Sequence, residues 1–341
     1  MQRLDIEQAR KLWQEESLFT LGKMAHETRL RMHPEKMVTY IVDRNINYTN
    51  ICMSACKFCA FFKPPGSGDG YVLTFDQLAE KISETIELGG EQILLQGGMN
   101  PDLDLDFYQK MLGFIKERFP RVAVHGFSPP EIWYMSSEAG LPVEEVIARL
   151  KQSGLDSIPG GGAEILTDRV RKDLSPRKCM SHQWLEVMEK AHCQGLRTTA
   201  TMMFGHVETF EERLIHLERI RSLQDITGGF TAFIPWTFQP ANTQVRAREA
   251  SSDEYLKFLA LSRLFLDNIP NIQASWVTQG SKVGQLALLW GANDFGSTMI
   301  EENVVAAAGV SFKMPEEELR TLIQGAGFVP RRRRMDYTLV E

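Results

Sequence analysis

Three of the five cysteines lie close together, in the stretch NINYTNICMSACKFCAFF at residues 45–62. Cys52, Cys56 and Cys59 follow the spacing C-x3-C-x2-C. The irons of an iron–sulfur cluster are held by thiolates, normally four of them. Three thiolates from one short loop leave one iron without a protein ligand and free to bind a small molecule. The spacing therefore predicts a four-iron four-sulfur (4Fe-4S) cluster with one open iron.

A zinc site is the alternative interpretation of the same cysteines. Structural zinc usually takes four Cys or His ligands at closely spaced positions. Cys179 and Cys193 stand alone far downstream, and no spacing argument ties His26 or His33 to the cysteine stretch. The sequence therefore favours a cluster over zinc and leaves zinc open.

Composition limits the class of protein. The 341 residues include 43% hydrophobic and 24% charged residues, with a net charge of −6. This profile is typical of a soluble globular protein and argues against a general nucleic-acid or membrane-surface binder. The chain has no apolar run long enough to span a membrane and no apolar signal segment, and its odd cysteine count shows no disulfide pattern. We expect a cytoplasmic protein with no nucleic-acid or membrane partner.

Strand and helix patterns alternate along the chain and predict an α/β fold. Helical spacing over residues 4–31 is followed by a run of β-branched and aromatic residues at 37–43, which leads into the cysteine stretch. Seven more strand candidates follow, separated by helical patterns: 92–95, 122–125, 157–158, 198–204, 230–236, 272–276 and 286–290. Strict alternation implies right-handed crossovers and a parallel sheet. We expect a (β/α)8 TIM-type barrel, possibly incomplete, with an open doubly wound sheet as the alternative.

Domain boundaries follow from the same patterns. We expect a helical N-terminal extension over residues 1–36, a barrel over 37–310 and a C-terminal cap over 311–341. The active site of such a barrel lies at the carboxyl ends of its strands. Polar residues gather there, and the stretch KPPGSGDG at 63–70 is expected to form a flexible lid or connector.

The cysteine stretch resembles the signature of the radical S-adenosylmethionine (radical SAM) enzymes, C-x3-C-x-aromatic-C, placed after a first barrel strand. The resemblance implies a 4Fe-4S cluster on Cys52, Cys56 and Cys59, whose open iron binds S-adenosyl-L-methionine. The cofactor is then cleaved to a 5′-deoxyadenosyl radical that takes hydrogen from the substrate. The resemblance also implies that Phe58 packs near the adenine of the cofactor. Further cofactor-binding residues are expected at strand ends, namely Gln96, Gly97, Gly98, Ser128 and Glu164, and Arg177 is a candidate for the cofactor's carboxylate. The triplet Gly89-Gly90-Glu91 competes with Gly97-Gly98 but precedes its strand, so we interpret it as a helix cap.

Several other stretches resemble the menaquinone and deazaflavin group of radical SAM enzymes, among them LLQGGMNPDL, FIPWTFQPANT, SWVTQG and GANDFGSTMIEENVV. The resemblance is strongest to dehypoxanthine futalosine cyclases, and it implies dehypoxanthine futalosine as the substrate and an electron donor such as flavodoxin or ferredoxin. Carbon 4′ of the ribose would lose hydrogen and add to the aromatic ring, and loss of a proton and an electron would follow. A related enzyme making aminofutalosine or the deazaflavin precursor is the second hypothesis, and a non-catalytic metal-stabilised binding protein is the third.

The ring closure needs a proton acceptor, and the substrate needs hydroxyl and carboxylate partners. His206 and Glu208 are the first candidates for proton transfer, because both follow a predicted strand two residues apart, and Asp294 and Glu302 are further candidates. His206 is equally well explained as a hydrogen-bond partner of the substrate or of a loop. Candidates for substrate binding are the amides Gln239, Asn242, Gln279 and Asn293. Arg177 or Arg197 is expected to pair with a carboxylate of the substrate or of the cofactor.

Overall fold

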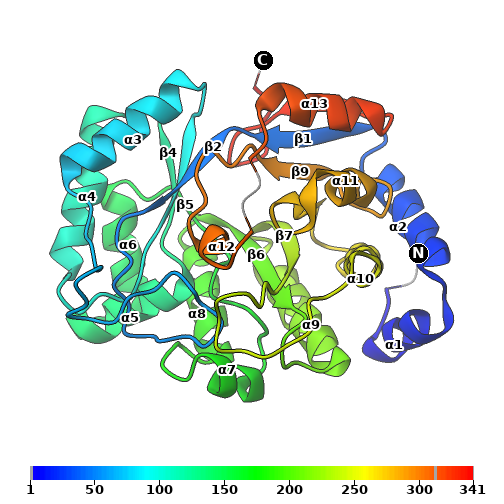
Figure 1. Ribbon diagram of the computed structural model, residues 1–341, viewed down its shortest axis with the longest axis horizontal. Coiled ribbons are helices and arrows are strands. Elements are labelled where there is room, and N and C mark those ends of the chain that lie inside the picture. The colour runs from blue at the N-terminus through cyan, green and yellow to red at the C-terminus, as the bar shows by residue number, and fades with distance from the viewer. Residues whose placement is uncertain (1–2, 311–312, 341) are drawn as a thin grey trace.

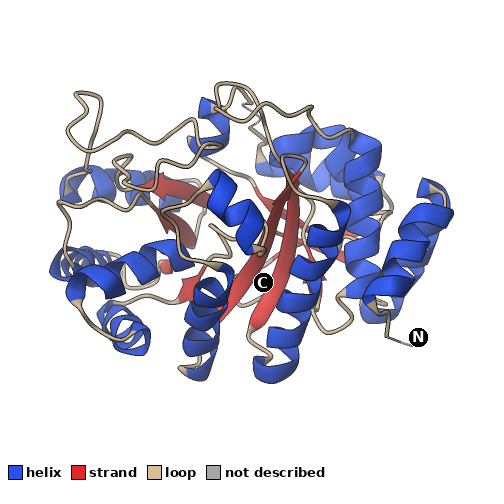
Figure 2. Cartoon of the chain, turned by 90° about the horizontal axis from the view of Figure 1, so that it is seen from below, coloured by secondary structure: helices blue, strands red, loops and turns tan. Residues whose placement is uncertain are grey.

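Seven parallel strands form the main sheet in the computed structural model, which describes residues 3–310 and 313–340. Neighbours in the sheet are also neighbours in the sequence, so each strand is followed by a helical crossover and the next strand beside it. The sheet curls into a half-barrel with its strands inside and its helices outside (Figures 1 and 2). The strands are β2 (Asp43–Asn47), β3 (Gln92–Gln96), β4 (Ala123–Gly126), β5 (Ser157–Ile158), β6 (Arg197–Phe204), β7 (Phe230–Thr237) and β8 (Asn271–Ile272).

A second sheet of three parallel strands closes the gap. Its order is β10 (Val329–Arg332), β1 (Met37–Ile41) and β9 (Asp294–Ser297). β9 meets the end of β8 through a bridge between Gln273 and Asp294. On the other side, the chain after β9 runs along β2, where the Ile300 amide donates to the Asp43 carbonyl at 3.2 Å. The predicted α/β barrel is confirmed, and it is closed by main-chain contacts on both sides of β9.

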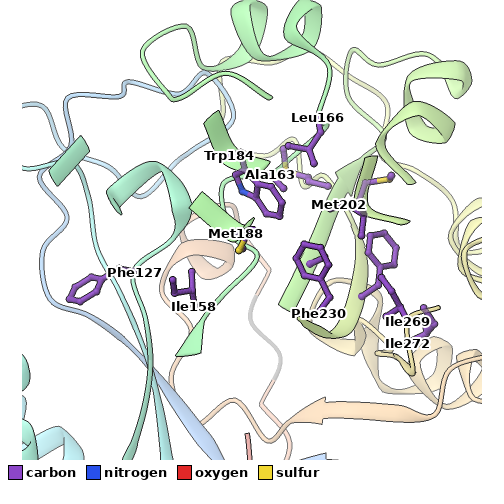
Figure 3. Packing of buried hydrophobic residues seen from close by; sticks show 14 of the residues in the cluster. Phe127, Ile158, Ala163, Leu166, Trp184, Met188, Met202, Phe230, Ile269 and Ile272 are labelled. Atoms are coloured by element: carbon purple, nitrogen blue, oxygen red, sulfur yellow. The ribbon is translucent and has the colours of Figure 1, made fainter. Parts of the chain in front are cut away.

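The helices cover the outside of the barrel and bury its apolar surface. Ile158 and Phe230 of the strands pack with Trp184 and Met188 of α8 in the core (Figure 3). Among the described residues, no helix is long and apolar enough to cross a membrane. The helices are α1 (Ile6–Glu15), α2 (Leu18–Met32), α3 (Phe75–Glu87), α4 (Leu105–Arg118), α5 (Pro129–Ala139), α6 (Val143–Ser153), α7 (Asp168–Leu174), α8 (Ser181–Cys193), α9 (Phe210–Thr227), α10 (Ser252–Phe265), α11 (Trp276–Ala287), α12 (Val304–Ala307) and α13 (Glu316–Gly325).

Some of the predicted strands are wrong in detail. The run at 37–43 is split at Val42, so that β1 joins the small sheet and β2 enters the barrel before the cysteines. The strand predicted at 272–276 ends at Ile272, and the run at 286–290 forms the end of α11 and a turn. Short apolar runs do not distinguish a strand from a buried helix. Here α11 begins at Trp276, whose indole donates to the Ser297 carbonyl at 3.0 Å, and continues to Ala287.

The C-terminal segment lies across the floor of the barrel, at the amino ends of the strands. β10 pairs with β1, and the following residues Arg333, Met335 and Tyr337 line the interior cavity. The guanidinium of Arg333 contacts the Asp294 carboxylate at 2.5 Å, and both side chains are buried. The segment predicted as a cap thus supplies, in its described part, a strand and the closure of one end of the cavity.

Candidate active site

The cysteine loop follows β2 and is fixed to three neighbouring segments. The Cys52 amide donates to the Lys63 carbonyl at 2.9 Å, the Met53 amide to the Met99 carbonyl at 2.9 Å, and the Lys57 amide to the Leu174 carbonyl at 2.9 Å. Cys56 is buried, whereas Cys52 and Cys59 are partly exposed. The loop is therefore held against the segment after β3 and against the end of α7.

The surroundings of the three thiols suit cluster ligation. The amides of Ser54 and Met99 each point at the Cys52 sulfur at 3.4 Å, and the Ser54 hydroxyl lies 2.8 Å from the Cys56 sulfur. Among the residues that the structure describes, no three Cys, His, Asp or Glu side chains are placed to share a single metal ion. One zinc ion would need such a set, whereas a cluster takes one thiolate per iron. The donor set fits a cluster better than zinc.

Lys178 is the charged neighbour of this loop that the sequence did not reveal. Its ammonium lies 2.9 Å from Oε1 of Glu164 and 5.0 Å from the centre of the Phe58 ring. Burial opposes the charge of Lys178, but the nearby Cys56 and Glu164 outweigh burial and raise its pKa. The second Glu164 oxygen is buried 3.7 Å from the Arg171 guanidinium and has no hydrogen-bond partner. A bound molecule with an N–H or O–H donor would satisfy that oxygen, so Glu164 fits the cofactor role expected for it.

The glycine pair after β3 packs directly on the cysteine loop. A Cβ on Gly98 would lie 2.2 Å from the Ile51 carbonyl oxygen, and one on Gly97 would lie 2.4 Å from the Tyr48 ring. Gly89 instead ends α3 with a φ of +85°. Only the pair at 97–98 therefore brings bare backbone against the cysteines.

Two other expected cofactor residues lie nearby but are already bonded. Ser128 begins α5, and its hydroxyl donates to Glu131 at 2.6 Å. Arg177 donates to the Met53 carbonyl at 3.1 Å, next to Cys52 in the sequence, and is exposed. Arg177 thereby contacts the cysteine loop directly, and Glu131, the partner of Ser128, also accepts the Gly97 amide at 3.0 Å.

A cavity of about 300 Å³ lies inside the barrel. Its wall on the side of β2 to β6 is largely polar and includes Asp43, Asn45, Gln92, Gln96, His125, Ser157, Thr199 and Thr201. The facing wall is largely apolar and includes Ile234, Trp236, Trp276, Val277, Met299, Val304 and Val305. Gln96 belongs to this wall and directly precedes the glycine pair, so the cavity adjoins the cysteine loop.

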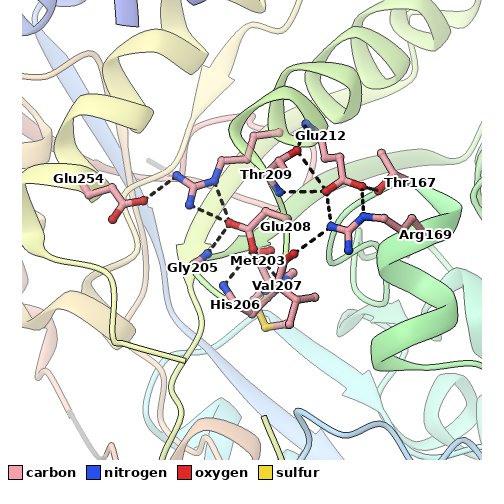
Figure 4. Close-up of polar contacts among 11 residues, drawn as sticks. Thr167, Arg169, Met203, Gly205, His206, Val207, Glu208, Thr209, Glu212 and Glu254 are labelled. Atoms are coloured by element: carbon pink, nitrogen blue, oxygen red, sulfur yellow. Dashed lines mark hydrogen bonds and ion pairs between the residues drawn. The ribbon is translucent and has the colours of Figure 1, made fainter. Parts of the chain in front are cut away.

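His206 and Glu208 lie together outside this cavity (Figure 4). Nδ1 of His206 contacts Glu208 at 2.9 Å, and its Nε2 contacts the Met203 carbonyl at 2.9 Å. Glu208 also accepts from Arg213 at 2.7 Å and from the Gly205 amide at 2.7 Å. Burial would raise the pKa of Glu208, but His206 and Arg213 together lower it to about 2. Both ring nitrogens of His206 and the Glu208 carboxylate are therefore occupied by internal contacts, and Glu208 is ion-paired with Arg213.

The remaining predicted residues are held by internal contacts. Asp294 pairs with Arg333, and the Asn293 amide donates to Asn271 at 2.7 Å. Gln239 and Gln279 both donate to the Thr237 hydroxyl, at 3.1 and 2.6 Å. The Asn242 amide donates to the Ala307 carbonyl at 3.0 Å. None of these five side chains lines the cavity, as far as the structure describes the chain.

The sequence predictions missed two polar residues, His125 in the cavity wall and Lys178 beside the cysteine loop. His125 is the last residue of the strand predicted at 122–125. Side chains alternate between the two faces of a strand, and this alternation could have identified His125 as an inward-facing residue. Lys178 lies in the loop between α7 and α8, where no pattern marks it.

Two family matches cover most of the chain. Residues 46–220 match the radical SAM superfamily, and residues 227–341 match the CofH/MqnC C-terminal region. The chain is 48% identical over 340 residues to the cyclic dehypoxanthine futalosine synthase of Halalkalibacterium halodurans, covering 99% of this chain and 92% of that protein. It is 44% identical over 339 residues to the protein of the same name from Streptomyces coelicolor, covering 98% and 85%.

Relatives with a different name are nearly as similar. The 5-amino-6-(D-ribitylamino)uracil–L-tyrosine 4-hydroxyphenyl transferase 1 of Methanosarcina barkeri is 44% identical over 325 residues, covering 92% of this chain and 85% of that protein. Among solved structures, methylornithine synthase (PylB) matches with a TM-score of 0.72 at 18% identity, covering 97% and 95%. The hydrogenase maturase HydG of Carboxydothermus hydrogenoformans matches with a TM-score of 0.75 at 16% identity, covering 98% and 77%. The chain therefore belongs to the radical SAM superfamily, in the family that includes the cyclic dehypoxanthine futalosine synthases.

Proposed function

We propose that the protein cyclises dehypoxanthine futalosine to cyclic dehypoxanthine futalosine, a step of the futalosine route to menaquinone. The observation that carries the proposal is the 48% identity to a synthase of that name over 99% of the chain. The cavity supports it, because one polar wall and one apolar wall suit a molecule that joins a sugar to an aromatic ring.

Cys52, Cys56 and Cys59 would hold the 4Fe-4S cluster, and the backbone at Gly97-Gly98 and the side chain of Glu164 would contact S-adenosylmethionine. When bound, these groups supply the radical that removes hydrogen from ribose carbon 4′. The chain's own part is to hold the sugar and the ring together in a cavity shielded from water. A one-electron carrier of the flavodoxin or ferredoxin class would deliver the electron, and the cytoplasm is the expected compartment.

Ring closure also requires that a proton leave the aromatic ring together with an electron. Glu208 and Asp294 are paired with Arg213 and Arg333, His206 contacts Glu208 and the Met203 carbonyl, and none of the three lines the cavity. The proposal therefore gives these three residues a role in holding the strand ends rather than in proton transfer.

The test is anaerobic reconstitution with iron and sulfide, reduction, and addition of S-adenosylmethionine and dehypoxanthine futalosine. We expect 5′-deoxyadenosine together with a product lighter than the substrate by two hydrogens. Cofactor cleavage without that product would contradict the proposed substrate but not the radical chemistry. A protein that binds zinc and never cleaves the cofactor would contradict both.

A further inference from the structure

One layer of inward-facing side chains crosses the middle of the cavity. Asn45, Leu94, His125 and Ser157 are register partners on the four adjacent strands β2 to β5. Partners in neighbouring parallel strands point to the same face, and all four residues line the cavity. Any ligand in the cavity therefore lies beside Asn45 and His125.

The protonation of His125 is fixed by its neighbour. The Ser157 hydroxyl donates its only proton to the Arg197 carbonyl at 2.6 Å. Its oxygen lies 2.8 Å from Nδ1 of His125, so Nδ1 must carry the proton that this contact needs. Burial and the nearby Arg333 lower the pKa of His125 to about 3, which keeps the ring neutral. Nε2 then bears a lone pair, and no partner within residues 3–310 or 313–340 donates to it.

Asn45 presents a second acceptor in the same layer. Its Nδ2 donates to Oε2 of Glu302 at 2.6 Å. The other oxygen of Glu302 accepts the amides of Val304 and Val305, at 2.7 and 2.8 Å, so that oxygen is occupied by the main chain. Oδ1 of Asn45 is left buried without a hydrogen-bond partner. A buried carbonyl oxygen in this state is unfavourable, and a ligand that supplies an O–H or N–H donor would stabilise it.

The charges of the cavity decide which part of a ligand fits this layer. Arg333 is the one Lys or Arg side chain among the lining residues that the structure describes, and it is paired with Asp294. Two acceptors without donors repel a carboxylate and attract hydroxyl or N–H groups. An aromatic group finds its place on the opposite wall, against Trp236 and Val304.

We infer that Nε2 of His125 and Oδ1 of Asn45 form a hydroxyl-binding site that holds the sugar of the substrate in the middle of the barrel. The inference rests on the proposed function for the identity of that sugar, the ribose of dehypoxanthine futalosine. The carboxylate of the aromatic arm then points away from this layer. His125 and Asn45 are specificity-determining residues that replace the amides expected from the sequence.

The experiment compares steady-state kinetics of three reconstituted variants with the wild type. His125→Phe and Asn45→Leu each remove one acceptor, and a substrate hydroxyl is then buried without a partner. We expect KM for dehypoxanthine futalosine to rise about 10- to 100-fold for each, with a smaller change in kcat. His192→Phe is the matched control, because its two ring nitrogens bond Thr227 and Thr198 outside the cavity, and its KM should equal that of the wild type.

A substrate analogue separates recognition from folding. A hydroxyl donates one proton, so the two acceptors take two different ribose hydroxyls. An analogue that lacks the hydroxyl bound by one acceptor should lose affinity for the wild type and show little further loss with the variant of that same acceptor, His125→Phe or Asn45→Leu, because the partner is already absent. If both variants keep the wild-type KM, or if the analogue loss persists in full in both, the inference is wrong while the proposed function stands.

Failure of the proposed function has a different signature. Turnover of 5-amino-6-(D-ribitylamino)uracil with tyrosine, and none of dehypoxanthine futalosine, would contradict the proposed function. The ribityl chain of 5-amino-6-(D-ribitylamino)uracil also bears hydroxyl groups. In that case the KM of the wild type and of the two variants is compared for this compound instead. A rise in KM supports the hydroxyl site, and an unchanged KM contradicts it.

Discussion

Replacing Arg333 with Met removes the cation that ties the C-terminal segment to the barrel floor. In the native chain, Nε and Nη2 of Arg333 donate to the two oxygens of Asp294 at 2.5 and 3.2 Å. Burial opposes the charge of Arg333, but Asp294 outweighs burial and raises its pKa. Met fills much of the same volume, so the change tests the ion pair rather than a cavity.

The expected loss of stability depends on the hydrogen bonds that Asp294 retains without Arg333. The carboxylate is fully buried, and it still accepts from the Thr39 hydroxyl at 2.6 Å and from the Gly296 amide at 2.8 Å. Leaving one partner of a buried pair uncompensated costs about 3–5 kcal/mol, and the two remaining donors place the loss near 3 kcal/mol. Arg333 also packs over the Tyr337 ring at 4.0 Å, a contact that Met retains in part.

Urea unfolding measures the effect, with Arg331→Met as the matched control. Arg331 is exposed on β10, two residues before Arg333, so the free energy of unfolding of the Arg331→Met variant should differ from that of the wild type by no more than about 0.5 kcal/mol. The double variant Arg333→Met/Asp294→Asn removes both charges. Its loss of unfolding free energy should be about 2 kcal/mol smaller than the sum of the losses of the two single variants. A loss below about 1 kcal/mol for Arg333→Met, or additive losses in the double variant, would refute the reasoning.

Three further outcomes are expected. Cys56→Ala should lose the brown colour of the reconstituted cluster and all cofactor cleavage, whereas Cys193→Ala, at an exposed site, should keep both; equal behaviour of the two would contradict the ligand assignment. Gly98→Ala places a Cβ 2.2 Å from a main-chain oxygen of the cysteine loop and should reduce iron content at least severalfold, measured by iron and sulfide analysis; full loading would contradict the packing argument. Burial lowers the pKa of His125 to about 3, so the folded state stays neutral while the unfolded state charges below about pH 6.5. The contribution of neutral His125 to the stability of the fold is therefore complete above about pH 6.5 and is lost as the pH falls toward 3. The free energy of unfolding should drop from pH 7 to pH 5 by about 2 kcal/mol less in His125→Phe than in the wild type. An equal drop in both proteins would show that the ring is not neutral.

The parts of the site set by local spacing were predictable from the sequence. The three cysteines lie in one loop. The glycine pair after β3 can pack on that loop because glycine lacks a Cβ, which would collide with the loop at either position. The alternation of strand and helix patterns likewise predicted the barrel, which the parallel order β2 to β8 confirms.

Features that depend on distant partners were not predictable. β10 pairs with β1 almost three hundred residues earlier in the chain, and nothing in the sequence VPRR marks it as a strand. The alternation of side chains along a strand also does not predict the direction of a side chain that follows the strand. His206 folds back onto the Met203 carbonyl, whereas His125, within a strand, faces the cavity.

A side-by-side turnover assay tests the central claim most directly. The reconstituted, reduced protein receives S-adenosylmethionine with either dehypoxanthine futalosine or 5-amino-6-(D-ribitylamino)uracil plus tyrosine, and the products are identified by mass spectrometry. The account predicts cyclic dehypoxanthine futalosine in the first reaction and no coupled product in the second. A coupled product in the second reaction, with dehypoxanthine futalosine recovered unchanged in the first, would contradict it.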